Sequence, residues 1–156
     1  DVLNGSGGLR IAPQGVRRGF ASAARATGLR GRWERLGERP FVVCDTGHNE
    51  SGIAEVAAQI ARQTYRKLYM VVGFVEDKDL SRVLPLLPRQ AHYVFTKAGI
   101  RRALDERELA RRAAGYGLQG ECVPTVNEAL ARARERAGPE DMIFIGGSTY
   151  VVAEVL

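Results

Sequence analysis

The chain has 156 residues, enough for one ordinary domain with its own hydrophobic core, and its 45% hydrophobic and 26% charged residues are typical of a globular protein rather than a disordered one. No apolar run approaches the ~18 residues that a membrane span needs, and the first residues are polar and glycine-rich, unlike a secretory signal. The formal net charge of +5 favours anionic partners, but arginines and glutamates alternate along the helical segments, which indicates a solvated surface rather than a nucleic-acid-binding one.

The first part of the chain differs in pattern from the rest. A glycine-rich turn at residues 4–8 precedes a helical segment over residues 15–26, which places four apolar side chains on one face. Glycines end this segment, and Pro40 opens the first strand. We therefore expect a helical arm or linker over residues 1–38 and one domain over residues 39–156.

From residue 41 onward, apolar strand segments alternate with helical segments. Strands are expected at residues 41–44, 68–72, 93–96, 121–123 and 142–145. Helical patterns lie between or after them, at residues 53–61, 105–117, 126–137 and from 148 onward, and residues 77–88 are expected to start a short helix that Pro85 and Pro88 constrain. The strands are continuous apolar runs, as expected of strands that are covered on both faces. Because parallel connections need crossovers, this order predicts an α/β fold with a doubly wound, mostly parallel, Rossmann-like sheet and helices on both faces.

Ligands of an open parallel sheet bind outside the carboxyl ends of its strands. This rule selects four loops of the chain, at residues 45–49, 73–79, 96–102 and 146–148. The four loops follow four different strands. We therefore expect folding to bring several of them together into one site.

The first of these loops carries a carboxylate, an imidazole and an amide within five residues. Asp45 could accept hydrogen bonds from an ammonium group, and His48 could donate one to a carboxylate or phosphoryl oxygen. In a second interpretation, Asp45 bonds its own loop and Asn49 caps the following helix. A cap requires no histidine, so His48 tilts the interpretation towards a binding site.

The other three loops each allow a binding and a structural interpretation. Ser148 follows two glycines at a helix start, where backbone amides attract anions, but serine is also a common helix cap. Lys78 and Asp79 lie at a helix entry, where an aspartate cap with solvated charges explains the pattern more simply. Arg102 lies in a basic loop after the third strand, which suits an anionic substrate group as well as plain solvation.

Several catalytic signatures are absent from the sequence. There is no GxxxxGK[ST] phosphate loop, so this chain alone is not expected to hold ATP in the usual way. There is no HExxH, no GxSxG and no cysteine–histidine metal spacing, so we expect no metal site. Cys44 and Cys122 lie far apart in apolar runs, as expected of reduced thiols in a cytoplasmic protein.

Several segments, taken in order, resemble one protein family. They are "GLRGRWERL", "PFVVCDTGHN", "MVVGFVEDKDL", "VFTKAGIRRAL", "VNEAL" and "DMIFIGGSTYVVAEVL". Together they resemble the C-terminal domain of folylpolyglutamate synthase/dihydrofolate synthase, in the Mur ligase superfamily. The resemblance runs from about residue 28 to residue 156, and the helix before it resembles the end of the ATPase domain that precedes this domain in the family.

The resemblance implies an ATP-dependent ligase that activates a carboxylate as an acyl phosphate and joins it to the amine of glutamate, on folate or dihydropteroate. It implies that an N-terminal ATPase domain is the partner of this domain and binds most of the ATP and Mg²⁺, so that this fragment alone is inactive. The implied partners include no nucleic acid and no membrane. The implied site residues are Asp45 and His48 (catalytic and glutamate-binding), Ser148 (glutamate-binding), Arg32 and Asn49 (ATP-binding), with Lys78, Asp79 and Arg102 as further candidates.

The chain departs from the family in this loop. The family usually has D-G-A-H-N-P, whereas residues 45–50 here are D-T-G-H-N-E, so that Thr46-Gly47 replace the Gly-Ala pair and Glu50 replaces the proline. Two other hypotheses stay open. A peptidoglycan-type Mur ligase would add its amino acid to a UDP-linked precursor, although "GRWE" and "DKD" resemble the folate branch more closely. A non-catalytic α/β binding module would share the same alternation of strands and helices.

Overall fold

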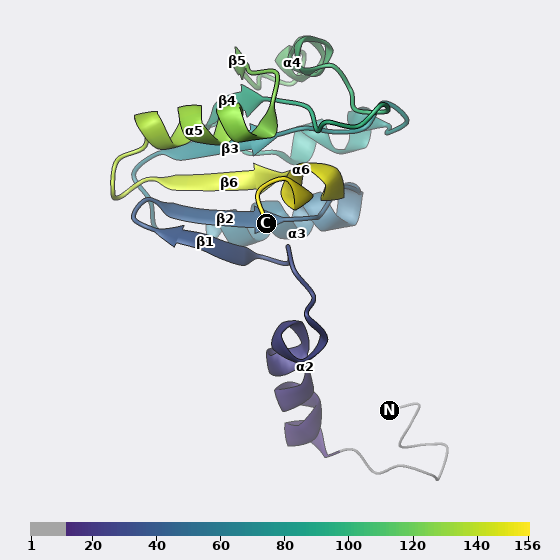
Figure 1. Ribbon diagram of the computed structural model, residues 1–156, viewed down its shortest axis with the longest axis vertical. Helices are drawn as coiled ribbons and strands as arrows, with labels where there is room; N and C mark the ends of the chain where they lie inside the picture. Colours follow the sequence, from purple (N-terminus) through teal and green to yellow (C-terminus); the bar gives the residue numbers. More distant parts are fainter. Residues whose placement is uncertain (1–11) are drawn as a thin grey trace. The chain divides into compact units, whose positions relative to one another are not determined.

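A computed structural model describes residues 12–156, apart from the side chains at positions 24 and 25. The glycine-rich turn predicted at residues 4–8 lies outside the described residues. The chain divides into two compact units, Asp1–Arg30 and Gly31–Leu156. Helix α2 (Pro13–Thr27) is the described element of the first unit, and the sheet with its helices forms the second (Figure 1).

Helix α2 confirms the helix predicted in the first part of the chain. Pro13 fits the first turn because N–H groups there have no partner within the helix. Gly28 follows the last turn with a φ of 68°, a left-handed conformation that suits glycine. Val16 and Phe20, on the predicted apolar face, are exposed.

The second unit is built on a six-stranded sheet with the order β1-β2-β6-β3-β4-β5. Five of its strands are parallel: β2 (Phe41–Asp45), β3 (Leu68–Val72), β4 (His92–Phe95), β5 (Gly120–Cys122) and β6 (Met142–Gly146). They confirm the five predicted strands. The last strand, β6, returns to the middle of the sheet, between β2 and β3, so the strand order reverses there. Such a reversal leaves a crevice at the carboxyl ends of the strands.

Strand β1 (Glu34–Glu38) is an element that the sequence pattern does not predict. It pairs antiparallel with β2, with a bulge between Arg35 and Gly37. An edge strand has only one neighbour and is often charged, so its sequence, ERLGE, carries no apolar run. Because β1 joins the sheet, the division between the two units falls after Arg30, earlier than the boundary predicted after residue 38.

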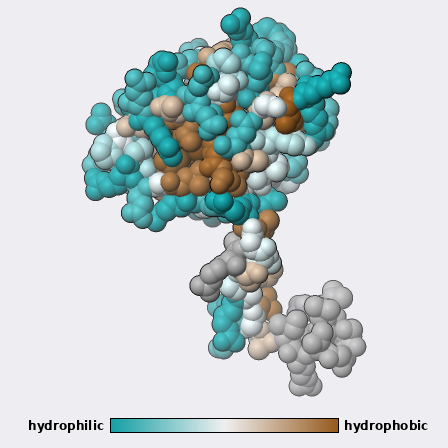
Figure 2. All heavy atoms as spheres, viewed as in Figure 1, coloured by the Kyte–Doolittle hydropathy of each residue, from teal (hydrophilic) through white to brown (hydrophobic). Residues whose placement is uncertain are grey.

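The helices cover both faces of the sheet, as predicted. Helices α3 (Glu50–Ala61) and α4 (Glu106–Ala114) pack on one face, and α5 (Val126–Arg136) and α6 (Thr149–Ala153) pack on the other. In Figure 1, α5 and α6 lie in front of the sheet and α3 lies behind it. Figure 2, in the same view, shows a mostly hydrophilic outer surface on α5, with apolar side chains gathered beside it over β6 and β2.

The predicted helix at residues 77–88 is instead a pair of 3₁₀ turns, Leu80–Arg82 and Leu84–Leu86. Pro85 lacks an N–H group, and its ring clashes with the preceding turn of an α-helix, so an α-helix cannot run through this position. The turns still bury Leu80 and Leu84 in the core. None of the helices formed by residues 12–156 has the length and hydrophobicity required to cross a membrane.

Candidate functional site

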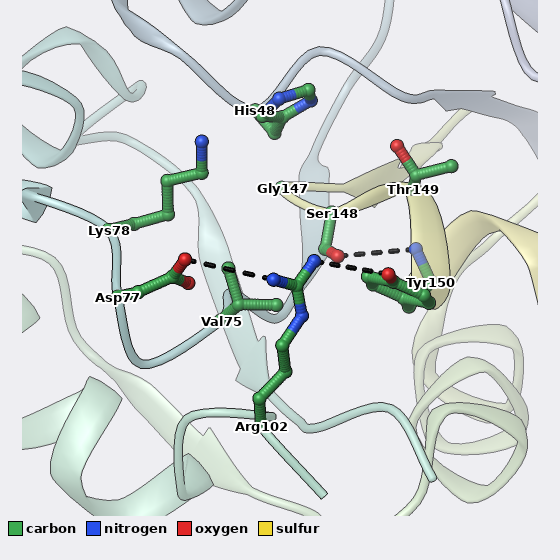
Figure 3. A pocket seen from close by; sticks show the side chains of 9 residues that line it. All are labelled: His48, Val75, Asp77, Lys78, Arg102, Gly147, Ser148, Thr149 and Tyr150. Carbon is green, nitrogen blue, oxygen red and sulfur yellow. Dashed lines mark hydrogen bonds and ion pairs between the residues drawn. The ribbon is translucent and has the colours of Figure 1, made fainter. Parts of the chain in front are cut away.

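A cavity of about 370 Å³ opens where β2, β3 and β6 end (Figure 3). All four predicted loops contribute side chains to its wall. They supply, in chain order, His48, Lys78, Arg102 and Ser148. Folding therefore brings the four strand ends together, as the rule for parallel sheets predicts.

Asp45 does not line this cavity, although it ends β2 directly beside it. Its carboxylate is buried, and each oxygen accepts a backbone hydrogen bond of 2.7 Å, one from Gly47 N and one from Trp33 N. The first bond closes the local loop, and the second holds a segment twelve residues earlier in the chain. Asp45 thus organises the loop from which His48 reaches the cavity.

The hydrogen bond from Trp33 N to Asp45 Oδ2 fixes the segment of residues 31–33, which contains Arg32. Trp33 has a φ of 46°, unusual for a residue other than glycine, and its N–H points to Asp45. Thr46 N donates to Gly31 O at 2.9 Å on the other side of the segment. Arg32 itself is exposed and is not among the residues that line the cavity.

His48 is half-buried and lines the cavity. Its Nδ1 lies 3.0 Å from Thr46 O, and a carbonyl oxygen can only accept a hydrogen bond. Nδ1 therefore carries the proton, which leaves Nε2 as the acceptor of the neutral ring. In this tautomer His48 can accept a proton, and after protonation both nitrogens can donate to an anion.

Asn49 and Asp79 act as helix caps. Asn49 Oδ1 accepts from Gly52 N at 2.8 Å at the start of α3. Asp79 accepts hydrogen bonds from the hydroxyl and the N–H of Ser81, and these bonds hold the pKa of the Asp79 carboxyl below its usual value. Both residues thus have the capping role that the sequence also allows, and neither lines the cavity.

The floor of the cavity is formed where β6 turns into α6. Gly147 has a φ of 88°, and a Cβ atom there would lie 2.8 Å from Gly73 O and 2.9 Å from the ring of Phe74. Only glycine allows the chain to turn so close to the end of β3. The turn places Ser148 at the start of α6, where the buried serine Oγ accepts from Tyr150 N at 3.2 Å.

Two side chains of the cavity hold Arg102 in place. Arg102 Nη2 donates to the hydroxyl of Tyr150 at 3.1 Å, and Nη1 lies 3.7 Å from Asp77 Oδ2. The guanidinium carbon also lies 5.2 Å from the centre of the Tyr150 ring, within the range of a cation–π contact. Figure 3 shows the guanidinium between these two partners, with His48 and Lys78 across the cavity.

The backbone fixes the same arrangement. Val75 and Ala103 form an antiparallel bridge, and Glu76 N donates to Arg102 O at 3.0 Å. The loops after β3 and β4 are therefore joined into one unit. Arg102 is placed opposite Asp77 by main-chain hydrogen bonds as well as by its side chain.

Asp77 and Tyr150 are cavity residues that the sequence pattern does not predict. In the sequence, Asp77 is one of the two aspartates that flank Lys78, and Tyr150 belongs to the predicted helix that follows Ser148. The available signal is their position, because each lies within two residues of a selected side chain at a strand end. Among residues 12–156 no group of three or more His, Cys, Asp or Glu side chains is placed to hold a metal ion.

Comparison with known proteins finds relatives of the whole second unit. One family model, described as Mur ligase, glutamate ligase domain, matches residues 31–149. A probable bifunctional folylpolyglutamate synthase/dihydropteroate synthase of Haloferax volcanii is 40% identical over 127 residues, which is 80% of this chain and 15% of that protein. A dihydrofolate synthase/folylpolyglutamate synthase of Escherichia coli K12 is 28% identical over 152 residues, which is 96% of this chain and 34% of that protein.

A solved structure of the same kind confirms the doubly wound fold. The Mycobacterium tuberculosis folylpolyglutamate synthase complexed with ADP matches with a TM-score of 0.78 at 28% identity, over 97% of this chain and 36% of that chain. The chain thus spans between 15% and 36% of the length of these three proteins.

Proposed function

From the membership of this chain in the family of Mur ligase glutamate ligase domains, we propose its function. We propose that the chain is the amino-acid-binding domain of an ATP-dependent ligase that joins glutamate to folate or dihydropteroate. One observation carries the proposal. The cavity wall presents two basic side chains, Lys78 and Arg102, and one acidic side chain, Asp77. Glutamate at neutral pH carries two carboxylates and one ammonium, so its charges complement those of the cavity. The names of the relatives support the folate branch.

In this proposal the ammonium of glutamate lies beside Asp77, which is the carboxylate that lines the cavity. The resemblance to the family gives Asp45 a place near the ammonium. We assign Asp45 instead to the loop that it organises, because its carboxylate is buried, holds two backbone N–H groups and does not line the cavity. Ser148 and His48 line the same cavity and would contact the substrate directly.

The proposed reaction forms a C–N bond. The glutamate nitrogen attacks the carbonyl carbon of an acyl phosphate, the carbon–oxygen bond to phosphate breaks, and phosphate leaves. Before the attack the ammonium must lose a proton, which the neutral ring of His48 can accept at Nε2. The acyl phosphate would form when a carboxylate oxygen of the folate or dihydropteroate takes the γ-phosphoryl group of ATP and ADP leaves, with Mg²⁺ neutralising the phosphate charge. The sequence of this domain has no phosphate loop to hold ATP and Mg²⁺.

The proposal therefore includes a partner, an N-terminal ATPase domain of the same protein. Helix α2 would be the end of that domain or the linker to it, since the division of the chain at Arg30 separates α2 from the sheet. Arg32 lies two residues after this division, which is a suitable place to reach a nucleotide bound by the preceding domain. Asn49, the other residue that the resemblance assigns to ATP, would contact the nucleotide while its Oδ1 caps α3. ATP and glutamate are cytosolic metabolites, so the proposal places the enzyme in the cytosol.

The test uses the full-length protein and measures ATP-dependent glutamate addition to dihydropteroate and to a reduced folate. His48→Ala, Ser148→Ala and Lys78→Met should each lower kcat/KM for glutamate at least about tenfold, the loss typical of one polar contact to a charged group. Lys67→Met is the matched control, because Lys67 is exposed and precedes β3 at the opposite end of the sheet.

Loss in the three variants with an active control supports the site. Variants that match the wild type would remove these residues from the site while leaving the family membership intact. If the wild type uses neither folate substrate but adds an amino acid to a UDP-linked peptidoglycan precursor, the folate proposal is wrong.

A further inference from the structure

We propose that Arg102 determines the amino-acid specificity of the cavity, by binding the side-chain carboxylate of the substrate and thereby selecting glutamate over glutamine. The inference rests on the proposed function and adds the residue that sets its specificity. Two partners hold the guanidinium, and its other N–H donors remain open to the cavity.

A guanidinium has five N–H donors in a planar fork that matches both oxygens of a carboxylate. Tyr150 takes one donor of Nη2, and Asp77 faces Nη1 at 3.7 Å. The Arg102 side chain remains 56% exposed while lining the cavity, so its other donors are open to an incoming group. The side-chain amide of glutamine offers one acceptor oxygen, and its NH₂ group would face a cation. Arg102 therefore distinguishes two side chains of nearly the same shape.

Lys78, the other basic side chain of the cavity, is less suited to this distinction. A lysine ammonium is a point charge on a flexible stem. Lys78 lines the cavity but forms no ion pair with another side chain of residues 12–156. Arg102 is already ordered by Tyr150, by Asp77 and by the backbone bond from Glu76 N, so it loses little side-chain entropy when a substrate binds. Fixed donors reject an isostere that cannot satisfy them. The side-chain carboxylate consequently lies at Arg102, and the α-carboxylate lies across the cavity, towards Lys78 and His48 (Figure 3).

Tyr150 is a positioning residue in this arrangement. Its hydroxyl accepts from Arg102 and its ring lies beside the guanidinium, while its own backbone N–H donates to Ser148 Oγ. Tyr150→Phe keeps the ring and removes only the hydroxyl partner. This change should loosen Arg102 without removing its charge, so its effect should have the same sign as loss of Arg102 and be smaller.

The experiment measures kcat and KM of the full-length protein with glutamate and with glutamine as the incoming amino acid, at saturating ATP and saturating folate substrate. The variants are Arg102→Met, which keeps the length of the stem, Arg102→Lys, which keeps the charge but not the fork, and Tyr150→Phe. Arg101→Met is the matched control, because Arg101 is the exposed neighbour and does not line the cavity. The KM for ATP is measured for every variant.

We expect Arg102→Met to raise the KM for glutamate about 10- to 100-fold and to lower the glutamate-to-glutamine ratio of kcat/KM by a similar factor. Arg102→Lys should fall between this variant and the wild type, and Tyr150→Phe should lower the ratio about threefold to tenfold. Arg101→Met and the KM for ATP should be unchanged.

Equal losses for both amino acids in Arg102→Met would overturn the inference, because a merely structural role or a contact to the α-carboxylate affects glutamate and glutamine alike. An unchanged ratio with no loss would overturn it as well. In either case the wild type still adds glutamate, so the proposed function stands. A wild type that adds neither amino acid to a folate would instead refute the proposed function, and the inference with it.

Discussion

Removal of the Asp45 carboxylate should destabilise the sheet domain more than removal of a carboxylate that makes the same number of backbone bonds at the surface. Asp45 is only 8% exposed, and its oxygens accept from Gly47 N and Trp33 N, both at 2.7 Å. In Asp45→Ala both N–H groups lose their partner. The Gly47 N–H lies in a buried residue that water does not easily reach.

The size of the effect follows from these two bonds. A hydrogen bond to a charged group contributes about 1.5–3 kcal/mol, and relief of the buried charge offsets part of the loss. We therefore expect Asp45→Ala to lower the free energy of unfolding by about 2–4 kcal/mol. Asp105→Ala is the comparison, because Asp105 also accepts from two backbone N–H groups, at 3.0 and 3.4 Å, but at an exposed helix start where water replaces it.

The assay is urea unfolding of the 156-residue chain, followed by the fluorescence of Trp33, its only tryptophan. Trp33 packs against the core and donates one of the two hydrogen bonds to Asp45, so its emission reports the region in question. An unchanged denaturant slope would show that the variants unfold in the same way. If Asp45→Ala loses no more stability than Asp105→Ala, the two buried bonds do not carry the role assigned to them.

Two further changes test the cavity floor and the core. Gly147→Ala should destabilise the domain and weaken glutamate binding, because the new Cβ meets the ring of Phe74 at 2.9 Å. Gly117→Ala is the control, because Gly117 has a similarly positive φ (77°) with open space around it. If Gly147→Ala lowers the free energy of unfolding in urea no more than Gly117→Ala does, the steric argument is wrong. Burial raises the pKa of Tyr93, whose hydroxyl donates to Pro88 O at 2.7 Å. A raised folded-state pKa contributes stability that is present below the unfolded pKa of ~10 and is lost as the pH rises towards the folded pKa. At neutral pH the wild type should be more stable than Tyr93→Phe by about 1 kcal/mol. This difference should shrink above pH ~10 in urea unfolding measured at increasing pH. A constant difference would refute this reasoning.

The fold class is predictable from the sequence because it depends on local periodicity. Five apolar runs, separated by helical stripes such as Ile53, Val56 and Ile60, suffice to predict a parallel sheet covered on both faces, and these side chains are buried as expected. Strand β1 is missed because an edge strand needs no apolar run. The 3₁₀ turns around Pro85 replace a predicted helix because a local proline constraint outweighs the apolar pattern.

The sequence by itself also determined which loops meet, since the carboxyl ends of parallel strands share one edge of the sheet whatever the loops contain. Only the tertiary structure decided which side chains of those loops face the cavity. Asp45 and His48 lie three residues apart in one loop, yet Asp45 bonds a backbone N–H from Trp33, twelve residues earlier, and His48 turns to the cavity. Arg102 likewise meets Tyr150 across 48 residues of chain. Such hydrogen bonds form only because folding brings together segments that are distant in sequence. The spacing of residues along the chain therefore does not predict them.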